Sequence, residues 1–344
     1  MHPSSPSKRG SRGSSRSRRA DARSARPSRA LLRGCWHGSE SPVAEAAKTS
    51  AGFVAIVGAP NAGKSTLLNQ LVGAKVSIVS PKVQTTRARV TGITIAGASQ
   101  LVFVDTPGIF EPKRRLERAM VAAAWQGAAD ADEIVVVVDA ANRGHAVDDN
   151  RILDGLKEAG RKAVLVLNKI DLVRRESLLP MAARLNQAFR FKETFMVSAE
   201  TGDGVEDLKS HLAGSMPAGP WLYPEDELTD LPMRLLAAEI TREQLFRQLH
   251  DEVPHQLAVE TEVWEEFRNG SVRIKQVVFV QRDGQKAIVL GKGGARIRSV
   301  GEAARTELET LFERRVHLFL FVKVRENWPE DPERYRMMGL DWAP

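Results

Sequence analysis

Cysteine is nearly absent from this 344-residue chain, since Cys35 is the only one. No internal disulfide can form, and a reducing compartment is expected. Long apolar runs are also missing. None approaches the roughly 20 residues of a membrane-spanning helix, and the candidate run at 134–138 is typical of a buried strand. Hydrophobic residues still make up 42% of the chain, so the length and composition favour two domains with sizeable cores.

Acidic side chains are scarce only at the N-terminus. Residues 1–33 carry ten basic side chains against one acid, Asp21, a balance of +9. Because the whole chain sums to +7, residues 34–344 sum to −2, and any nucleic-acid surface there must be a local patch. Residues 1–49 are expected to be a disordered Arg- and Ser-rich extension. We favour a solvated bacterial extension, or a start codon placed too early, over the alternative of an organelle transit peptide.

Short apolar segments alternate with helical patterns between residues 50 and 213. Because several of these segments are apolar on both faces, they indicate a parallel sheet covered by helices, hence a doubly wound α/β domain. The predicted strands are 53–57, 93–95, 101–104, 134–138, 164–167 and 195–197. Helices are predicted at 67–72, 151–159 and 178–189.

The first loop of this domain, GAPNAGKST, matches the phosphate-binding motif of P-loop NTPases, G-x-x-x-x-G-K-[ST]. Its glycines let backbone N–H groups surround phosphate oxygens, and the following helix directs its positive end at them. Lys64 is predicted to reach the β- and γ-phosphates, and Ser65 to ligate Mg²⁺. The predicted phosphate-binding residues are Gly58, Ala59, Pro60, Asn61, Ala62, Gly63, Lys64, Ser65 and Thr66. The alternative is a glycine-rich turn with a surface lysine.

Three later segments, at 105–108, 168–171 and 198–200, each follow a predicted strand and are together expected to select guanine. In the first, Asp105 is expected to hold Mg²⁺, and the Gly108 N–H to meet the γ-phosphate. In the second, the Asp171 carboxylate can accept from guanine N1–H and the 2-amino group, donors that adenine lacks. A backbone N–H of the third can donate to guanine O6. The residues are Asp105, Thr106, Pro107, Gly108, Asn168, Lys169, Asp171, Ser198, Ala199 and Glu200.

A nucleotide-sensing switch is expected in residues 81–89, PKVQTTRAR. A threonine hydroxyl there can complete the Mg²⁺ shell and be released on hydrolysis. Thr86 is our choice and Thr85 the competitor; the remaining alternative is that both are ordinary loop residues.

A second domain is predicted over 233–330, after a linker at 214–232 that holds four prolines and two glycines, and before a C-terminal tail at 331–344. Helices are predicted at 233–249 and 295–312, and strands at 257–267, 272–280 and 316–324. A G-x-x-G loop at 291–294 lies between two helices. This order resembles an α+β type II KH fold, whose loop approaches the RNA backbone closely. The alternative is a glycine-rich helix connector.

Basic side chains gather around this loop and supply the local patch. Lys292 is predicted to contact phosphate, whereas Ile288 and Ile297 are equally plausible as groove walls or core. The predicted RNA-binding residues are Lys286, Ile288, Gly291, Lys292, Gly293, Gly294, Arg296, Ile297 and Arg298.

The segments GAPNAGKST, QTTR, DTPG, NKID, SAE and VLGKGGARIR, in this order, strongly resemble the Era family of GTPases over about residues 50–335. The resemblance implies a GTPase that uses GTP, GDP and Mg²⁺. It also implies binding near the 3′ end of small-subunit ribosomal RNA and a role in assembly of a 30S-type particle.

Ile109 stands where Ras-like enzymes have a water-orienting glutamine. An isoleucine cannot orient water, so the predicted catalytic groups are Lys64 and Thr86. Asn61 matches the asparagine that coordinates K⁺ in related GTPases, although it could be an ordinary loop residue. The hypothesis is slow hydrolysis stimulated by K⁺.

A competing function is a membrane-associated signalling GTPase that uses the KH fold to bind protein. A third candidate function, a nucleotide-dependent RNA-modifying enzyme or helicase, is disfavoured because the sequence shows no second set of catalytic residues. We expect a cytoplasmic monomer, with peripheral contact to the inner membrane or organelle import left open.

Overall fold

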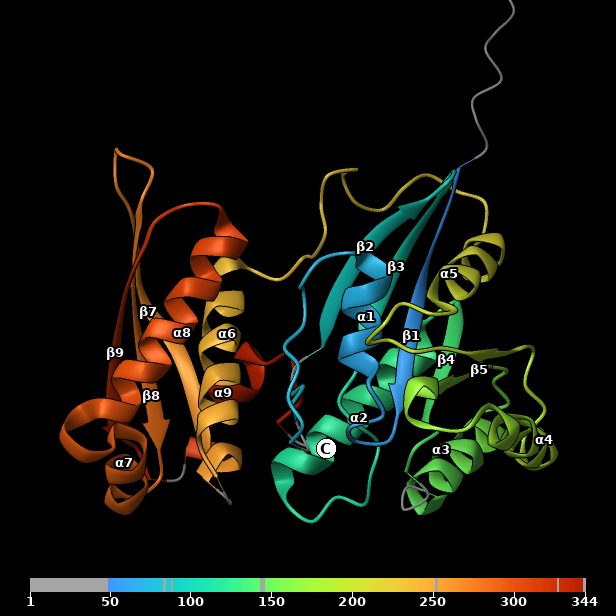
Figure 1. Ribbon diagram of the computed structural model, residues 1–344, viewed down its shortest axis with the longest axis horizontal. Coiled ribbons are helices and arrows are strands. Elements are labelled where there is room, and N and C mark those ends of the chain that lie inside the picture. Colours follow the sequence, from blue (N-terminus) through green and yellow to red (C-terminus); the bar gives the residue numbers. More distant parts are fainter. Residues whose placement is uncertain are drawn as a thin grey trace, which may run out of the picture. The chain divides into compact units, whose positions relative to one another are not determined.

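The computed structural model describes residues 49–82, 85–87, 89–142, 146–250, 253–326 and 328–342 (Figure 1). The predicted N-terminal extension, apart from Thr49, lies outside these residues. Within them, no helix combines the length and apolar character needed to cross a bilayer.

The first region contains a six-stranded sheet with the order β2-β3-β1-β4-β5-β6. Its strands are β1 Ser50–Gly58, β2 Val90–Ala96, β3 Ser99–Asp105, β4 Glu133–Asp139, β5 Val164–Asn168 and β6 Thr194–Met196. Strands β3, β1, β4, β5 and β6 are parallel, so their C-terminal ends meet at one edge. The expectation of a parallel sheet is wrong for β2, which is antiparallel to β3. Only two residues, Gly97 and Ala98, join these strands, too few for a parallel crossover.

Helices cover both faces of this sheet (Figure 1). They are α1 Lys64–Val72, α2 Arg115–Asp130, α3 Ala146–Glu158, α4 Leu178–Ala188 and α5 Val205–Gly214. Val54 and Ile56 of β1 pack with α1 and α5, whereas Ala55 and Val57 pack with α2, α3 and α4. This alternation explains why residues 53–57 of β1 are all apolar, and the doubly wound α/β expectation is confirmed.

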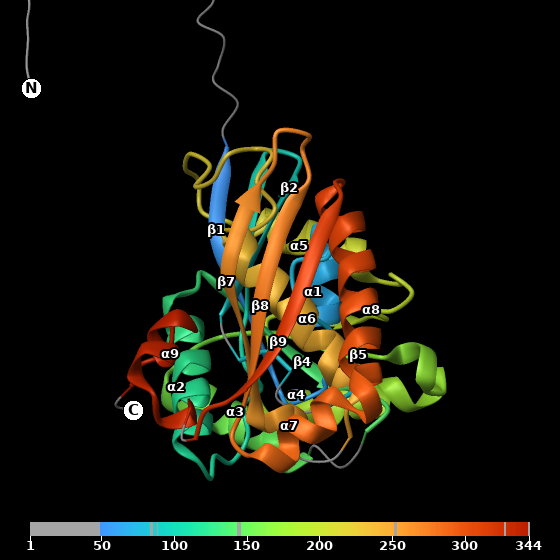
Figure 2. The ribbon, with the colours of Figure 1, turned by 90° about the vertical axis from the view of Figure 1, so that its left-hand side faces the viewer.

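The second region has the helix–strand–strand–helix–helix–strand order expected of a type II KH domain. Its elements are α6 Met233–Gln248, β7 Leu257–Glu266, β8 Val272–Val280, α7 Asp283–Leu290, α8 Ala295–Phe312 and β9 Val316–Val324. β7 is antiparallel to β8, and β9 is parallel to it. Figure 2 looks onto the three-stranded sheet, with α6 and α8 behind it. The predicted fold class, a P-loop G domain followed by an α+β KH domain, is confirmed.

The predicted linker is tied to the β2–β3 hairpin. Gln100 is fully buried; its Nε2 donates to the Tyr223 carbonyl at 2.8 Å, and its Oε1 accepts from the N–H groups of Leu222 and Tyr223 at 2.7 and 3.0 Å. The Ile93 N–H donates to the Leu228 carbonyl at 2.8 Å. The prolines and glycines therefore mark a segment that follows the sheet edge.

The segment 331–344, expected to be a tail, instead contains helix α9 Pro332–Met337. Tyr335 and Leu340 are buried against Ala119 and Met120 of α2. The sequence between β9 and this helix has no long apolar run, so its docking on the first region was not visible in the pattern.

Candidate functional site

A cavity of about 550 Å³ lies where the P-loop, the switch segment and the ends of β4 and β5 meet. Its lining residues include Lys64, Ser65, Thr86, Gly108 and Lys169. Loops at the carboxyl ends of parallel strands form the ligand sites of doubly wound folds. The fold therefore brings the first two predicted motifs and the switch into one site of nucleotide size.

The P-loop backbone is shaped by glycine. Gly63, the N-cap of α1, has φ 92°, a left-handed conformation that favours glycine. A Cβ on Gly108 would lie 2.9 Å from the Pro60 nitrogen, so a side chain there would separate the two phosphate-binding segments. Ala59 and Ala62 are fully buried beneath the loop, and Thr66 lines the cavity.

Lys64 extends along the inside of the loop. Its Nζ donates to the carbonyls of Gly58 at 3.1 Å and Ala59 at 2.9 Å. Burial lowers the pKa of Lys64 to about 8, and the nearby charge of Asp105 opposes that shift. A buried ammonium with only carbonyl partners stabilises added phosphate charge strongly, because little water screens it.

Three predicted Mg²⁺ ligands converge on one point. The Ser65 hydroxyl donates to Asp105 Oδ2 at 2.6 Å and shares a 2.9 Å hydrogen bond with the Thr86 hydroxyl. Thr86 Oγ1 also donates to Asp105 Oδ2, at 3.2 Å. Ser77 donates to the same oxygen at 3.0 Å; the sequence analysis missed it, because an isolated serine carries no motif.

The chemistry of this cluster fits a hard cation. Asp105 is fully buried, and its Oδ1 has no hydrogen-bond partner among the described residues. Burial raises its pKa, whereas Lys64 and the three hydroxyls lower it. A buried carboxylate beside hydroxyl oxygens is a magnesium-type donor set. Ser65, Thr86 and Asp105 would hold the ion, which supplies charge neutralisation at the β- and γ-phosphates when bound.

Thr85 and Thr86 are separated by the structure. The Thr85 hydroxyl donates to the Lys82 carbonyl at 2.7 Å, away from Asp105, whereas the Thr86 side chain is buried in the oxygen cluster. The geometry therefore favours Thr86 as the switch hydroxyl.

We expect Thr86→Val to lower GTP turnover at least tenfold and to raise the Mg²⁺ concentration required, because removing a group that orders a metal site typically costs 10- to 100-fold. Thr85→Val is the matched control and should stay within about threefold of wild type. Turnover as a function of Mg²⁺ concentration checks both; equal loss in the two variants would contradict the assignment.

Asn168 bonds to two of the predicted nucleotide-binding segments. Its Nδ2 donates to the Ala62 carbonyl at 2.9 Å, and its Oδ1 accepts from the Ala199 N–H at 3.0 Å. It thereby ties the P-loop to the third guanine segment. Ser198 is buried, and its N–H donates to the Asp203 carbonyl at 2.9 Å; Glu200 is exposed.

Lys169 and Asp171 are the residues predicted to contact the guanine base. Lys169, at φ 64°, donates through Nζ to Asp139 Oδ2 at 2.6 Å and to the Asn61 carbonyl at 2.8 Å. The Asp171 side chain is exposed just beyond β5. Asp139 was missed in the sequence, although its position at the end of a predicted strand is the signal that identified Asp105.

Thr106 and Pro107, which follow Asp105, have structural roles. The Thr106 hydroxyl donates to the Ile56 carbonyl at 2.8 Å, and Pro107 is buried. Ile109, at the expected glutamine position, is fully buried in the core, and its N–H donates to the Gly58 carbonyl at 3.1 Å. Its side chain therefore takes no part in orienting water.

Asn61 contacts the switch directly. It has φ 60°, and its Nδ2 donates to the Pro81 carbonyl at 3.1 Å. The Asn61 amide and the Pro81 carbonyl therefore lie side by side in the lining of the phosphate cavity.

The KH loop has the conformation that its glycines predict. Gly291, Gly293 and Gly294 have φ of 70°, 59° and 76°. Lys292 and Arg298 are exposed, and Lys286 is half-buried. Arg296 is partly engaged, since its Nη1 donates to the Ile288 carbonyl at 2.8 Å.

The two isoleucines at this loop differ in environment. Ile288 is 44% exposed, whereas Ile297 packs against the core that contains Val289 and Val300. Ile288 is therefore the better candidate for a groove wall.

The KH domain also contacts the switch, which no sequence motif indicated. The Arg242 Nη2 of α6 donates to the Thr85 carbonyl at 2.5 Å. Arg87 donates through Nη1 to the Leu257 carbonyl at 2.6 Å and through Nη2 to the Pro254 carbonyl at 3.2 Å. Thr86 is thus held at the phosphate site while its two neighbours are bonded to the KH domain.

Comparison with known proteins agrees with both domains. A family model described as 50S ribosome-binding GTPase matches residues 53–169, and a KH-domain model matches residues 252–329. GTPase Era of Rhizobium meliloti is 61% identical over 299 residues, which cover 87% of this chain and 95% of that protein. GTPase Era of Brucella suis is 58% identical over 298 residues, 87% of this chain and 96% of that protein.

Two crystal structures are similar over almost the same span, each with a TM-score of 0.80. One is an Aquifex aeolicus Era variant bound to GDP and AlF4⁻, 39% identical, and the other is Era with MgGDPNP and nucleotides 1506–1542 of 16S ribosomal RNA, 40% identical. Both matches cover 85% of this chain and 99% of the other. Since identity of this level extends across both the nucleotide site and the KH loop, the chain belongs to the Era family of GTPases.

Proposed function

We propose that this GTPase binds single-stranded RNA near the 3′ end of small-subunit ribosomal RNA and assists assembly of the small ribosomal subunit. The observation that carries the proposal is the KH loop, with three glycines at positive φ and an exposed lysine between them. Such a loop admits the sugar–phosphate chain closely. The related Era structure that contains a segment of 16S ribosomal RNA supports the choice of target.

Replacing Gly293 and Gly294 together by aspartate should weaken RNA binding at least tenfold, because two carboxylates would face the phosphates. Aspartate tolerates left-handed conformations better than most residues, so the loop can keep its shape. The measurement is crosslinking and fluorescence titration with an oligonucleotide matching the organism's small-subunit RNA 3′ end, with and without a GTP analogue.

The matched control is the pair Gly270→Asp and Gly339→Asp. Both glycines have positive φ, and an added Cβ at either would meet no atom within 4 Å. This double variant introduces the same charge away from the loop and should bind RNA like wild type. Equal binding by the loop variant would count against an RNA function and favour the KH fold as a protein-interaction module.

The Asn61 amide and the Pro81 carbonyl beside it support K⁺ as an activator of slow GTP hydrolysis. We expect turnover to be several-fold higher in K⁺ than in Na⁺ at matched ionic strength. Asn61→Ala should remove the difference between the two salts, while Asn186→Ala on α4 should retain it. Equal wild-type turnover in the two salts would contradict the role of K⁺.

We also propose that the protein is a cytoplasmic monomer whose partner is a 30S-type particle. The alternative partner, which the sequence analysis left open, is a membrane surface contacted peripherally. Sedimentation of the full chain with small-subunit particles or with vesicles, in GTP-analogue and GDP states, separates these partners.

A further inference from the structure

Three hydroxyl groups of the described residues donate to Asp105 Oδ2, and the Ser77 hydroxyl is the one that is not a predicted metal ligand. Ser65 and Thr86 are both expected to bind Mg²⁺ through the hydroxyl oxygens that contact Asp105. Ser77 is 2% exposed, and its Oγ lies 3.0 Å from the carboxylate oxygen. Its hydrogen bond to Asp105 can therefore be kept whether or not the ion is bound.

The backbone of Ser77 is held by the helix that carries Ser65. Asn69 lies one turn after Ser65 on α1. Its Oδ1 accepts from the N–H groups of Val76 and Ser77 at 3.0 and 2.9 Å, and its Nδ2 donates to the Ser77 carbonyl at 2.8 Å. Because the amide uses both its acceptor and its donor on one short segment, it fixes the position of that segment. Asn69, Ser77 and Asp105 thus form a hydrogen-bonded chain within the G domain.

The residue after Ser77 packs against the KH domain. Ile78 is 3% exposed and belongs to an apolar cluster that includes Leu236 and Ile240 of α6. This contact involves the Ile78 side chain alone, whereas the N–H and the carbonyl of Ser77 are both bonded to Asn69. The Ser77 hydroxyl is therefore placed by the G domain, even if the packing of Ile78 changes.

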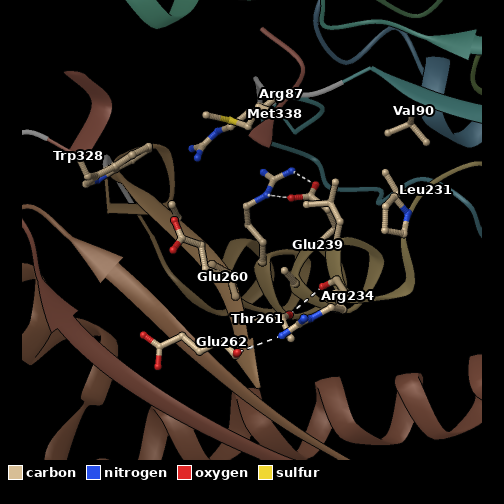
Figure 3. A pocket seen from close by; sticks show the side chains of 16 residues that line it. Arg87, Val90, Leu231, Arg234, Glu239, Glu260, Thr261, Glu262, Trp328 and Met338 are labelled. Atoms are coloured by element: carbon tan, nitrogen blue, oxygen red, sulfur yellow. Dashed lines mark hydrogen bonds and ion pairs between the residues drawn. The ribbon is translucent and has the colours of Figure 1, made fainter. Parts of the chain in front are cut away.

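Thr86 is held in a different way, through neighbours that bond to the KH domain. Arg242 of α6 donates to the Thr85 carbonyl, and Arg87 donates to two carbonyls of the KH domain. Figure 3 shows this side of the switch, where Arg87 lines a cavity of about 480 Å³ together with Arg242. The position of Thr86 thus depends on contacts outside the G domain. A switch segment that senses the γ-phosphate is also expected to leave the site after hydrolysis.

We propose that Ser77, held in place by Asn69, is the positioning residue that keeps Asp105 oriented for Mg²⁺ after the switch has released Thr86. The Ser77 hydroxyl holds one carboxylate oxygen throughout the nucleotide cycle. Asp105 thereby keeps the orientation that binds the ion in the GDP-bound protein as well as in the GTP-bound protein.

The two nucleotide states differ in how much Asp105 depends on Ser77. While GTP is bound, the engaged Thr86 also restrains the carboxylate. Once Thr86 has left, Ser77 remains as the hydroxyl donor that is not itself a ligand. Hydrogen bonds of this kind orient a metal ligand, and their removal typically lowers metal affinity 10- to 100-fold. The loss of the Ser77 hydroxyl should therefore be felt mainly with GDP.

Mn²⁺ is a suitable probe, because electron paramagnetic resonance measures its binding to the nucleotide-bound full chain without any turnover. Ser77→Ala should weaken Mn²⁺ binding at least tenfold with GDP and less than threefold with a non-hydrolysable GTP analogue. Asn69→Ala should show the same dependence on the nucleotide. The double variant should bind Mn²⁺ no more weakly than the weaker single variant, because the two residues act through one chain of hydrogen bonds.

The matched control is Ser271→Ala, because Ser271 is 3% exposed and its hydroxyl donates to Asn269 within the KH domain. This variant should bind Mn²⁺ like wild type in both states. Thermal melting shows whether each variant is folded, and Asn69 is only partly buried, so Asn69→Ala tests the proposal even if Ser77→Ala does not fold. A merely structural role would lower the melting temperature without distinguishing the nucleotides. Unchanged Mn²⁺ affinity of a folded variant with GDP, or equal loss with both nucleotides, would overturn the proposal.

Discussion

Lys64→Met should lower GTP turnover about 100- to 1,000-fold, the usual cost of removing one preorganised charge from a buried reaction site. Methionine keeps the unbranched chain of lysine as far as Cε and removes the Nζ that lies under the P-loop. Within the described part of the chain, no carboxylate is in hydrogen-bond contact with this buried ammonium, so the melting temperature should hold or rise. Phosphate release in single-turnover reactions measures the effect.

Two further measurements make the role of Lys64 specific. Lys157→Met, which removes an exposed lysine of α3, should turn over GTP normally. Because burial lowers the pKa of Lys64 to about 8, the nucleotide-free protein loses this charge above that pH. A proton must then be taken up on binding, and apparent GTP affinity should fall by up to tenfold per pH unit. An unchanged pH profile in Lys64→Met would show that another group is responsible.

Asp171→Asn should change which nucleotide binds. The carboxylate is expected to accept two hydrogen bonds from guanine, and bonds to a charged group contribute about 1.5–3 kcal/mol each. Loss of that pairing should weaken GTP about 100-fold or more. Xanthine has a carbonyl where guanine has its 2-amino group, so the asparagine amide can donate to it, and XTP should become the preferred ligand. Titration with fluorescent analogues of both nucleotides measures the exchange.

The control for this change lies in the neighbouring loop. Asp203 is also exposed, and its contact with Ser198 uses its backbone carbonyl. Asp203→Asn should therefore keep GTP selectivity. An Asp171→Asn protein that still prefers GTP over XTP would show that guanine is chosen elsewhere in the site.

Most of the first domain was predictable because its signals are local. Residues 134–138 of β4 and 164–167 of β5 are continuous apolar segments, and each predicted nucleotide motif follows a strand end. The parallel topology then gathers those ends at one edge. The hairpin of β2 and β3 was missed, because the predicted spans, 93–95 and 101–104, left five residues between the two strands. The strands are longer, and the two residues that join them force an antiparallel pair.

Long-range contacts account for what the sequence did not predict. Helix α9 docks on α2 through Tyr335, some 200 residues away along the chain. Ser77 joins the Asp105 cluster from a loop without a motif. Neither Tyr335 nor Ser77 belongs to a recognisable motif, so the role of each follows only from the distant residues that it contacts.

The sequence by itself determined the order of the functional motifs along the chain. These are a phosphate loop, the aspartate predicted to bind metal, the predicted guanine selector and a KH loop, and each is specified by residues adjacent in the chain. Only the tertiary structure favoured Thr86 over Thr85, bonded Arg87 of the switch and Arg242 of α6 across the two domains, and formed the cavity that these two arginines line. The physical reason is that motif spacing fixes backbone conformation locally, whereas burial, charge balance and unpaired donors depend on which distant segments meet.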